Sequence, residues 1–376
     1  MTVGVVFLAL AIVNILAFSR QIVVDHGEGS LPSGHSGRRT LSLLRHSETP
    51  PWKSIDNFIQ PVTVKPKPDE TSVYWHIPKS GGTNAKSYFG CLGLALGMFE
   101  CAPCCTESWL ADNVITFVSI THARGTVSKT GGLAKYGFAE EDRLEVFKPF
   151  ENSNARFVNV DVTTTEGLDR AVKLGLVQSS IADVIFFTNP TIIEGLFDTE
   201  HKGRVISIFR NPVDRLISKF YYLSIASWEP NYQPSWDGMD PLVWAREHDT
   251  DHNFVMRTLM GKKSQHLTDA DLPHAKKVLS ERFIVGLSDS YEESIRRFEV
   301  VMLVDEKIDD YTRNQCNSEF FGSRIEKKNA NDHPLVKPGS EIYNIIAENN
   351  SLDMALYEYI IELFAEQTEL IDSYKT

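Results

Sequence analysis

From residue 71 onward, short runs of apolar residues alternate with segments whose apolar residues recur at helical spacing. The apolar runs, bounded by turn-forming residues, are strand candidates at 72–77, 114–120, 156–162, 183–188, 204–209 and 282–287. Helical spacing is found at 84–96, 165–176, from 212 onward, 290–302 and 351–372. Short buried strands separated by helices are typical of a mainly parallel sheet with helices on both faces. The pattern therefore predicts an α/β fold.

The first 70 residues follow a different pattern. Residues 3–18 are uncharged and mostly apolar, and Arg20 is the first ionised side chain. This is typical of a signal peptide cleaved at Ala17-Phe18-Ser19, or of a signal anchor that spans a bilayer. Residues 20–70 hold six prolines and no persistent apolar period, which predicts a flexible stem. The expected organisation is a signal peptide or signal anchor at 1–19, a flexible stem at 20–70 and a lumenal domain at 71–376.

Composition narrows the function classes. The chain has 376 residues, is 42% hydrophobic and carries a net charge of −12. The hydrophobic content predicts a folded core, and the acidic balance argues against a nucleic-acid binder, which needs a broadly basic face. The acidic balance is nevertheless compatible with a local basic pocket.

The cysteines favour disulfides over a metal site. They are Cys91, Cys101, Cys104, Cys105 and Cys316. A lumenal location permits one or two disulfides that hold the 91–105 region, with Cys316 as a candidate partner. Cys101 and Cys104 have the spacing of half a zinc site, but no second pair at metal spacing follows them. The odd number leaves at least one thiol unpaired within the chain.

Residues 73–90, VYWHIPKSGGTNAKSYFG, join a predicted strand to a predicted helix. Ligands of α/β proteins bind at the carboxyl ends of strands, and the free N–H groups of a helix N-terminus attract anions there. Gly81 and Gly82 allow a tight turn, Lys79 adds a charge, and Ser80 and Thr83 add hydroxyl donors. An anion site is favoured over an ordinary turn. In a Walker A loop the lysine follows the glycines, whereas here it precedes them, which disfavours ATP hydrolysis with magnesium.

Residues 204–222, RVISIFRNPVDRLISKFYY, form a second strand-to-helix junction. Asn211 is a favourable N-cap, and Pro212 suits the first helical position. Arg210 lies at the end of the strand, and Ser218 lies two turns into the helix. A guanidinium and a hydroxyl so placed can share one phosphate. Each alone is compatible with an ordinary surface residue, but with the first turn they predict two anion pockets.

Together the two motifs resemble those of the membrane-bound carbohydrate sulfotransferases, above all the heparan sulfate 2-O and uronyl 2-O type. HIPKSGGT is similar to their loop for the 5′-phosphosulfate of PAPS (3′-phosphoadenylyl sulfate), and IFRNPVDRLISKFYY is similar to their 3′-phosphate motif. RFIVGLSDSYEESIRRFE and NSLDMALYEYIIELFAEQ resemble later family segments, so the similarity covers residues 72–370. The resemblance implies the sulfotransferase fold, a P-loop-NTPase-like parallel sheet flanked by helices.

The resemblance also implies residue roles. Lys79 would stabilise the charge that grows on the leaving phosphate, and Arg210 and Ser218 would hold the 3′-phosphate. The 5′ group would be cradled by Lys79, Ser80, Gly81, Gly82, Thr83 and Asn84. His122, after the predicted strand at 114–120, is the expected base, with a structural histidine as the alternative. Lys327 and Lys328 fall where the family has a loop that closes over the nucleotide, although a solvated basic run fits them equally well.

The resulting expectation is a Golgi type II membrane enzyme that transfers a sulfuryl group from PAPS to a carbohydrate hydroxyl without a metal. Its expected partners are the carbohydrate acceptor and, through residues 1–19, a membrane, with no nucleic acid. The acidic balance favours a neutral or lightly charged glycan, or a local basic cleft on an acidic body. Two alternatives stay open: a P-loop kinase or nucleotidase that uses ATP, and a non-catalytic lumenal protein with a nucleotide-binding fold.

Overall fold

The structure is a computed structural model that describes parts of the chain. The described residues are 55–96, 143–148, 154–160, 162, 165–188, 195–227, 229, 231–248, 251–262, 266–322 and 333–375. They all belong to one compact unit. Several predicted features lie outside these ranges. They are the signal peptide or signal anchor at 1–19, the strand at 114–120, His122, Lys327 and Lys328.

A seven-stranded sheet forms the centre of the described fold, in the order β3-β4-β2-β5-β1-β6-β7. The strands are β1 (Ser72–Trp75), β2 (Ala95–Leu96), β3 (Val146–Phe147), β4 (Arg156–Val158), β5 (Val184–Phe187), β6 (Arg204–Phe209) and β7 (Phe283–Leu287). Neighbouring strands are parallel except β3 and β4, which are antiparallel. The predicted α/β class with a mainly parallel sheet is confirmed.

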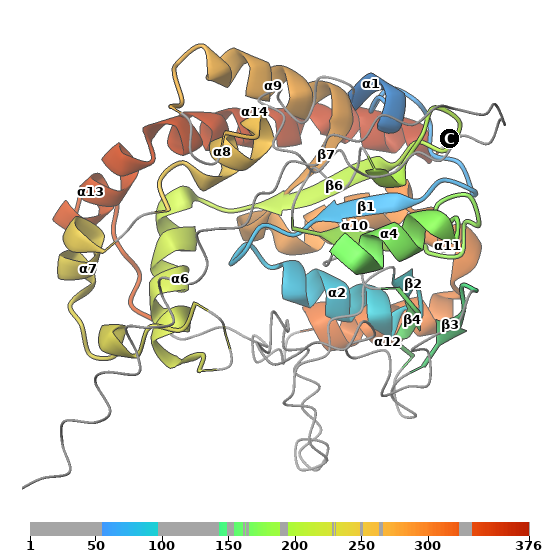
Figure 1. Cartoon of the computed structure of the whole chain (residues 1–376), viewed down its shortest axis with the longest axis horizontal. Helices are drawn as coiled ribbons and strands as arrows, with labels where there is room; N and C mark the ends of the chain where they lie inside the picture. The colour runs from blue at the N-terminus through green and yellow to red at the C-terminus, as the bar shows by residue number, and fades with distance from the viewer. Residues whose placement is uncertain are drawn as a thin grey trace, which may run out of the picture. The chain divides into compact units, whose positions relative to one another are not determined.

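Helices cover both faces of the sheet. They are α1 (Ile55–Phe58), α2 (Gly82–Cys91), α4 (Thr165–Lys173), α6 (Pro212–Ile225), α7 (Pro241–Glu247), α8 (Phe254–Met260), α9 (Asp271–Arg282), α10 (Tyr291–Val301), α11 (Val304–Lys307), α12 (Asp310–Phe321), α13 (Glu341–Asn349) and α14 (Ser351–Tyr374). Short 3-10 turns are η3 (Pro234–Trp236) and η4 (Ser288–Ser290). Helices α8, α9 and α14 lie on one side, and α2, α10 and α12 on the other (Figure 1).

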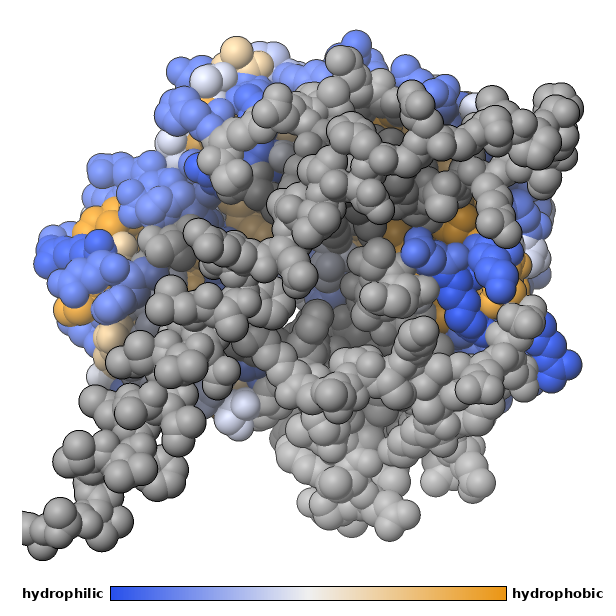
Figure 2. Space-filling model, viewed as in Figure 1, coloured by the Kyte–Doolittle hydropathy of each residue, from blue (hydrophilic) through white to orange (hydrophobic). Residues whose placement is uncertain are grey.

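The core explains why the strands are continuous apolar runs. In β1, Val73 and Trp75 pack into the cluster under α9 and α14, whereas Tyr74 packs into the cluster under α2 and α10. Every residue of β1, β5, β6 and β7 is buried, as expected for parallel strands covered on both faces. A third cluster, around Phe220 and Trp244, joins α6, α7 and α13. In the view of Figure 2 the described surface is mostly hydrophilic, with apolar areas over the α7 and α13 region.

Two sequence predictions are corrected. The helix expected at 84–96 ends at Cys91, because the chain turns at Gly93, whose φ of 78° lies in the left-handed region, and then enters β2. The stem expected at 20–70 is not a linker over residues 55–70. Ile55, Ile59 and Val62 are buried, since this segment packs against the sheet and the end of α14.

Among the helices within the described ranges, none is both long and apolar enough to cross a bilayer. The segment at 1–19 lies outside those ranges.

Candidate anion-binding site

The two predicted motifs meet at one edge of the sheet. Strands β1, β6 and β7 are adjacent and parallel, with Tyr74 opposite Ile206 and Phe209 opposite Leu287. Their carboxyl ends therefore point to the same edge. The turn at residues 76–81 follows β1, Arg210 follows β6, and η4 follows β7. The predicted placement of both motifs at strand ends is confirmed.

The turn after β1 has a backbone that suits only particular residues. Lys79 and Gly81 have φ values of 67° and 95°. A Cβ on Gly81 would lie 2.8 Å from the Tyr291 ring, and the Tyr291 hydroxyl donates to the Gly81 carbonyl at 3.0 Å. Glycine is therefore required at residue 81, because its φ is positive and because the Tyr291 ring leaves no room for a Cβ. Lys79 is not glycine, so its left-handed backbone costs about 1–2 kcal/mol and must be held by neighbouring contacts.

Gly82, the first residue of α2, packs against His76. A Cβ at Gly82 would lie 2.2 Å from Cδ2 of the His76 ring, so the ring comes this close only because residue 82 has no side chain. Burial, followed by the charges of Lys86 and Lys79, lowers the pKa of His76 to about 3. His76 is therefore neutral near pH 7 and supports the turn by packing.

The head of α2 offers donors that no described side chain uses. No side chain caps the first turn, which begins after the N-cap Gly81. The Ser80 hydroxyl is buried, and no described residue hydrogen-bonds to it. Thr83 and Asn84 lie half-buried in the same turn. Unsatisfied donors at a helix N-terminus are the features that bind a phosphate or sulfate.

Arg210 connects the second motif to the first. Its Nη1 donates to the Lys79 carbonyl oxygen at 3.1 Å, which holds the left-handed Lys79 peptide in place. Asn211 caps α6 by accepting from the N–H groups of Val213 and Asp214, and Pro212 occupies the first helical position, as predicted. Burial lowers the pKa of Arg210, and the nearby carboxylate of Asp214 opposes that shift.

The Lys79 ammonium lies against α6. Its Nζ is 3.8 Å from the centroid of the Tyr222 ring. Ser218 precedes Tyr222 by four residues, so both occupy one face of α6, and Lys79 is directed toward the face that carries the predicted Ser218. Burial, then the charge of Arg210, lowers the pKa of Lys79 to about 8, and Glu229 opposes this. Within the described part of the chain, neither cation forms a salt bridge with a carboxylate.

The two cations, Lys79 and Arg210, make the site electrostatically suited to an anion. Lys79 and Arg210 are partly buried, and the charge of Arg210 disfavours the charged form of Lys79. Partly buried charges are normally compensated by a partner of opposite sign. A bound anion would supply that partner, and the uncapped helix and the Ser80 hydroxyl would add hydrogen-bond donors. The residues present therefore fit a phosphate or sulfate group.

A disulfide fixes the opposite end of α2. Cys91, the last residue of α2, is bonded to Cys316 of α12 with an S–S distance of 2.06 Å. The prediction of a disulfide that holds this region is confirmed for Cys91 and Cys316. The other cysteines, Cys101, Cys104 and Cys105, lie outside the described residues.

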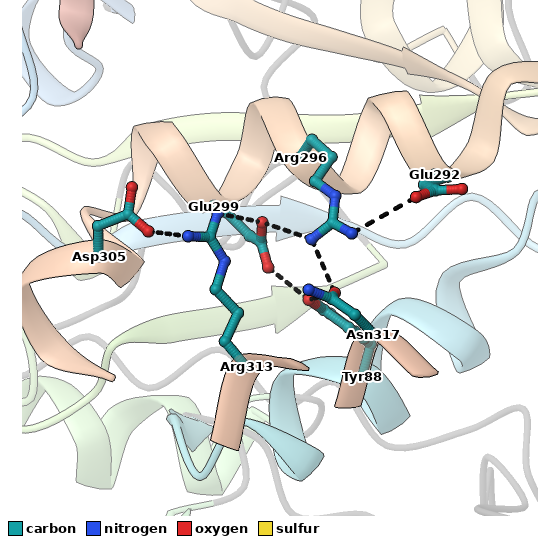
Figure 3. Close-up of polar contacts among 7 residues, drawn as sticks. All are labelled: Tyr88, Glu292, Arg296, Glu299, Asp305, Arg313 and Asn317. Atoms are coloured by element: carbon teal, nitrogen blue, oxygen red, sulfur yellow. Dashed lines mark hydrogen bonds and ion pairs between the residues drawn. The ribbon is translucent and has the colours of Figure 1, made fainter. Parts of the chain in front are cut away.

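A buried carboxylate reinforces the same attachment (Figure 3). The Glu299 side chain, 1% exposed, accepts a hydrogen bond from the Tyr88 hydroxyl of α2. Arg296 of α10 and Arg313 of α12 pair with the same carboxylate at 3.3 Å and 2.9 Å. Asn317 accepts from Arg296 at 2.7 Å. Helix α2, whose head forms the candidate site, is thus attached to α10 through the Tyr88–Glu299 hydrogen bond, and the same carboxylate joins α10 to α12 through Arg313.

Sequence reasoning missed several residues around the site. Tyr291 supports Gly81 from 210 residues away, and Glu229 hydrogen-bonds Tyr222 from the turn after α6. No local pattern marks either contact. Arg215, which lies near Ser218 in the second motif, is 1% exposed and pairs with Asp251 at 3.1 Å.

Comparison with known proteins gives no family assignment, because no family model and no curated protein matches the chain. Within the described residues no group of histidine, cysteine or acidic side chains could hold a metal ion. His122, Lys327 and Lys328 cannot be placed relative to the site, since they lie outside those residues.

Proposed function

We propose that the protein transfers a sulfuryl group from PAPS to the hydroxyl of a carbohydrate, and that its α/β domain has the sulfotransferase fold. The observation that carries the proposal is the contact between the two motifs at one sheet edge. Arg210 of the second motif hydrogen-bonds the Lys79 carbonyl of the first, and Lys79 lies on Tyr222 of the second. A donor with separate 5′ and 3′ groups requires two such cationic elements side by side.

The donor would occupy both elements. The head of α2, with Ser80, Gly81, Gly82, Thr83 and Asn84, would receive the 5′-phosphosulfate through backbone N–H groups and hydroxyls. Arg210 and Ser218 would hold the 3′-phosphate, for which a guanidinium provides paired donors. Within the described residues, the helix N-terminus without a side-chain cap, the Ser80 hydroxyl without a hydrogen bond and the two cations without a salt bridge support this assignment.

Lys79 has the main chemical role. Sulfuryl transfer forms a bond between the acceptor oxygen and sulfur and breaks the bond between sulfur and the bridging phosphate oxygen. Negative charge grows on that phosphate oxygen, and a positioned ammonium stabilises it most effectively where water is largely excluded. The pKa of about 8 keeps most Lys79 side chains protonated at pH 7.

Three further expectations stay predictions. They are His122 as the base, a membrane anchor at 1–19 with the domain in the Golgi lumen, and a neutral or lightly charged glycan as the acceptor. The ATP-dependent kinase and the non-catalytic binder are the alternatives that the experiment below separates from sulfuryl transfer.

The test is the thermal stability of the full chain with adenosine 3′,5′-bisphosphate, the product of PAPS, or with ATP and magnesium. A ligand present at 100 times its Kd stabilises the fold by about 2.7 kcal/mol. The bisphosphate should raise the unfolding midpoint of the wild type and of the exposed-site control Lys337→Ala. Lys79→Ala and Arg210→Ala should each make the rise smaller. A rise with ATP and magnesium alone would support the kinase, and no rise with either would support the non-catalytic protein.

A further inference from the structure

One short motif near the C-terminus lies outside the proposed site. Asn349-Asn350-Ser351 has the form Asn-X-Ser, which is the acceptor sequence for N-linked glycosylation in proteins of the secretory pathway. It is the one Asn-X-Ser or Asn-X-Thr sequence of the chain without proline at the middle position, because Asn189 is followed by Pro190. An N-linked glycan on this protein would therefore be carried by Asn349.

The motif lies at the junction of two helices. Asn349 is the last residue of α13, Asn350 lies between the helices, and Ser351 is the first residue of α14. Asn350 is fully buried. Its Nδ2 donates to the Ile346 carbonyl at 2.8 Å, and its Oδ1 accepts from the Asn253 N–H at 2.8 Å. The middle residue of the motif is thus directed inward, and both of its polar groups are hydrogen-bonded.

The two flanking side chains reach the surface instead. Asn349 is partly exposed and Ser351 is exposed. Within the described residues, neither side chain forms a hydrogen bond or an ion pair. The backbone around them is held by Asn253, whose Nδ2 donates to the Asn349 carbonyl at 3.3 Å and whose Oδ1 accepts from the Leu352 N–H at 3.0 Å. A glycan on Nδ2 of Asn349 would therefore replace no described hydrogen bond of the folded domain.

The disulfide supports the compartment in which this modification occurs. Cys91 and Cys316 are 225 residues apart in sequence, and their bond joins α2 to α12. Structural disulfides form and persist in the oxidising compartments of the secretory pathway. N-linked glycans are attached in proteins of the same pathway. The bridge and the acceptor sequence are therefore two independent features that point to one compartment.

We propose that Asn349 carries an N-linked glycan, an inference that rests on the lumenal location included in the proposed function. The donor is a lipid pyrophosphate-linked oligosaccharide, and the host oligosaccharyltransferase catalyses the transfer. Nδ2 of Asn349 bonds to C1 of the first sugar while the bond from C1 to the phosphate oxygen breaks. The electron pair of the broken bond stays on the lipid pyrophosphate, which leaves, and Nδ2 loses one proton. Ser351 supplies the hydroxyl that the acceptor sequence requires.

The test is expression of the full chain in cultured mammalian cells, followed by digestion with peptide N-glycosidase F. Digestion should increase the electrophoretic mobility of the wild type and leave an aspartate at residue 349, which peptide mass spectrometry detects. Asn349→Gln and Ser351→Ala should both migrate like the digested wild type, and digestion should not change them. Ser351→Thr keeps the hydroxyl and should keep the shift. Asn344→Gln, at an exposed position of α13 outside the motif, is the matched control and should also keep the shift.

A second acceptor sequence separates the outcomes. Asp69 is exposed and precedes Glu70 and Thr71, so Asp69→Asn in the Asn349→Gln background creates an Asn-X-Thr sequence. If this double variant shifts on digestion and the wild type does not, the chain enters the lumen and the glycosylation of Asn349 is wrong. If neither shifts, the inference fails together with the lumenal location. Neither result refutes the transfer reaction itself, which the binding of adenosine 3′,5′-bisphosphate tests separately.

Discussion

Replacing Gly82 with alanine tests the geometry of the turn without assuming any function. The added Cβ would lie 2.2 Å from Cδ2 and 2.6 Å from Nε2 of His76, whereas ordinary contacts begin at 3.4 Å. His76 is 8% exposed, and its N–H donates to the Phe187 carbonyl at 2.8 Å. The ring therefore cannot withdraw without disturbing the sheet edge, and the head of α2 must move instead.

The size of the effect follows from two opposing terms. Overpacking of a buried site costs about 1–3 kcal/mol. Alanine is favoured over glycine in a helix by up to about 1 kcal/mol, which offsets part of that cost. Gly82→Ala should therefore lower the free energy of unfolding by roughly 1–2 kcal/mol. Gly90→Ala, in the same helix, is the control: its Cβ would lie 3.1 Å from the Cβ of Ala155, a contact that a small shift relieves.

The assay is urea unfolding followed by tryptophan fluorescence, since Trp75 lies at the end of β1 beside the turn. Both variants should keep the wild-type dependence on urea, with the midpoint lowered for Gly82→Ala and nearly unchanged for Gly90→Ala. If Gly82→Ala is as stable as the wild type, or if Gly90→Ala is the weaker of the two, the close packing of His76 under the turn is wrong.

Three other predictions concern the charges and the disulfide. Because burial lowers the pKa of Lys79 to about 8, affinity for adenosine 3′,5′-bisphosphate should fall by about tenfold between pH 7 and pH 9 in calorimetry, and Lys79→Ala should lack this decline. Replacing Cys91 and Cys316 by serine should cost about 2–5 kcal/mol of unfolding free energy; an unchanged urea midpoint would contradict a bridge. Asp353 accepts from the N–H groups of Val255 and Met256, so Asp353→Asn, with one acceptor oxygen, should cost about 1–2 kcal/mol. Burial raises the pKa of Asp353 to about 6, so the folded state binds more protons than the unfolded state between pH 4 and 6. Stability of the wild type should therefore fall as pH rises through that window, and thermal melts of Asp353→Asn should show a smaller fall.

The parts of the fold that local signals determine could be predicted. The predictions of strand β6 and of the start of α6 matched the structure because a mostly apolar run, an N-cap asparagine and a first-turn proline are all adjacent in sequence. The position of Arg210, directly after the end of β6, could be predicted from the same junction. The turn at Lys79 could be predicted in part, since Gly81 marks its own left-handed backbone, whereas the left-handed backbone of Lys79 falls on a residue that is not glycine.

Long-range contacts account for what the sequence did not reveal. The end of α2 was misplaced because residues 92–96 continue an apolar run, and pairing of β2 with β4 and β5 decides their conformation. Residues 55–62 lacked a periodic pattern, yet Ile59 bridges Gly203 at the sheet. Lys79 meets Tyr222, and Tyr88 meets Glu299, across more than a hundred residues. The topology of the fold brings such partners together, and the local secondary-structure propensity of the sequence does not reveal them.

The most direct test of the central claim compares two nucleotides on two proteins. Calorimetry would measure the affinities of adenosine 3′,5′-bisphosphate and of adenosine 5′-monophosphate for the wild type and for Arg210→Ala. A guanidinium that bonds a phosphate contributes about 1.5–3 kcal/mol, so the wild type should prefer the bisphosphate by roughly tenfold or more. Arg210→Ala should lose that preference and bind the monophosphate as the wild type does. If the wild type binds both nucleotides equally, or if Arg210→Ala keeps the preference, the second motif does not hold a 3′-phosphate and the proposed donor is wrong.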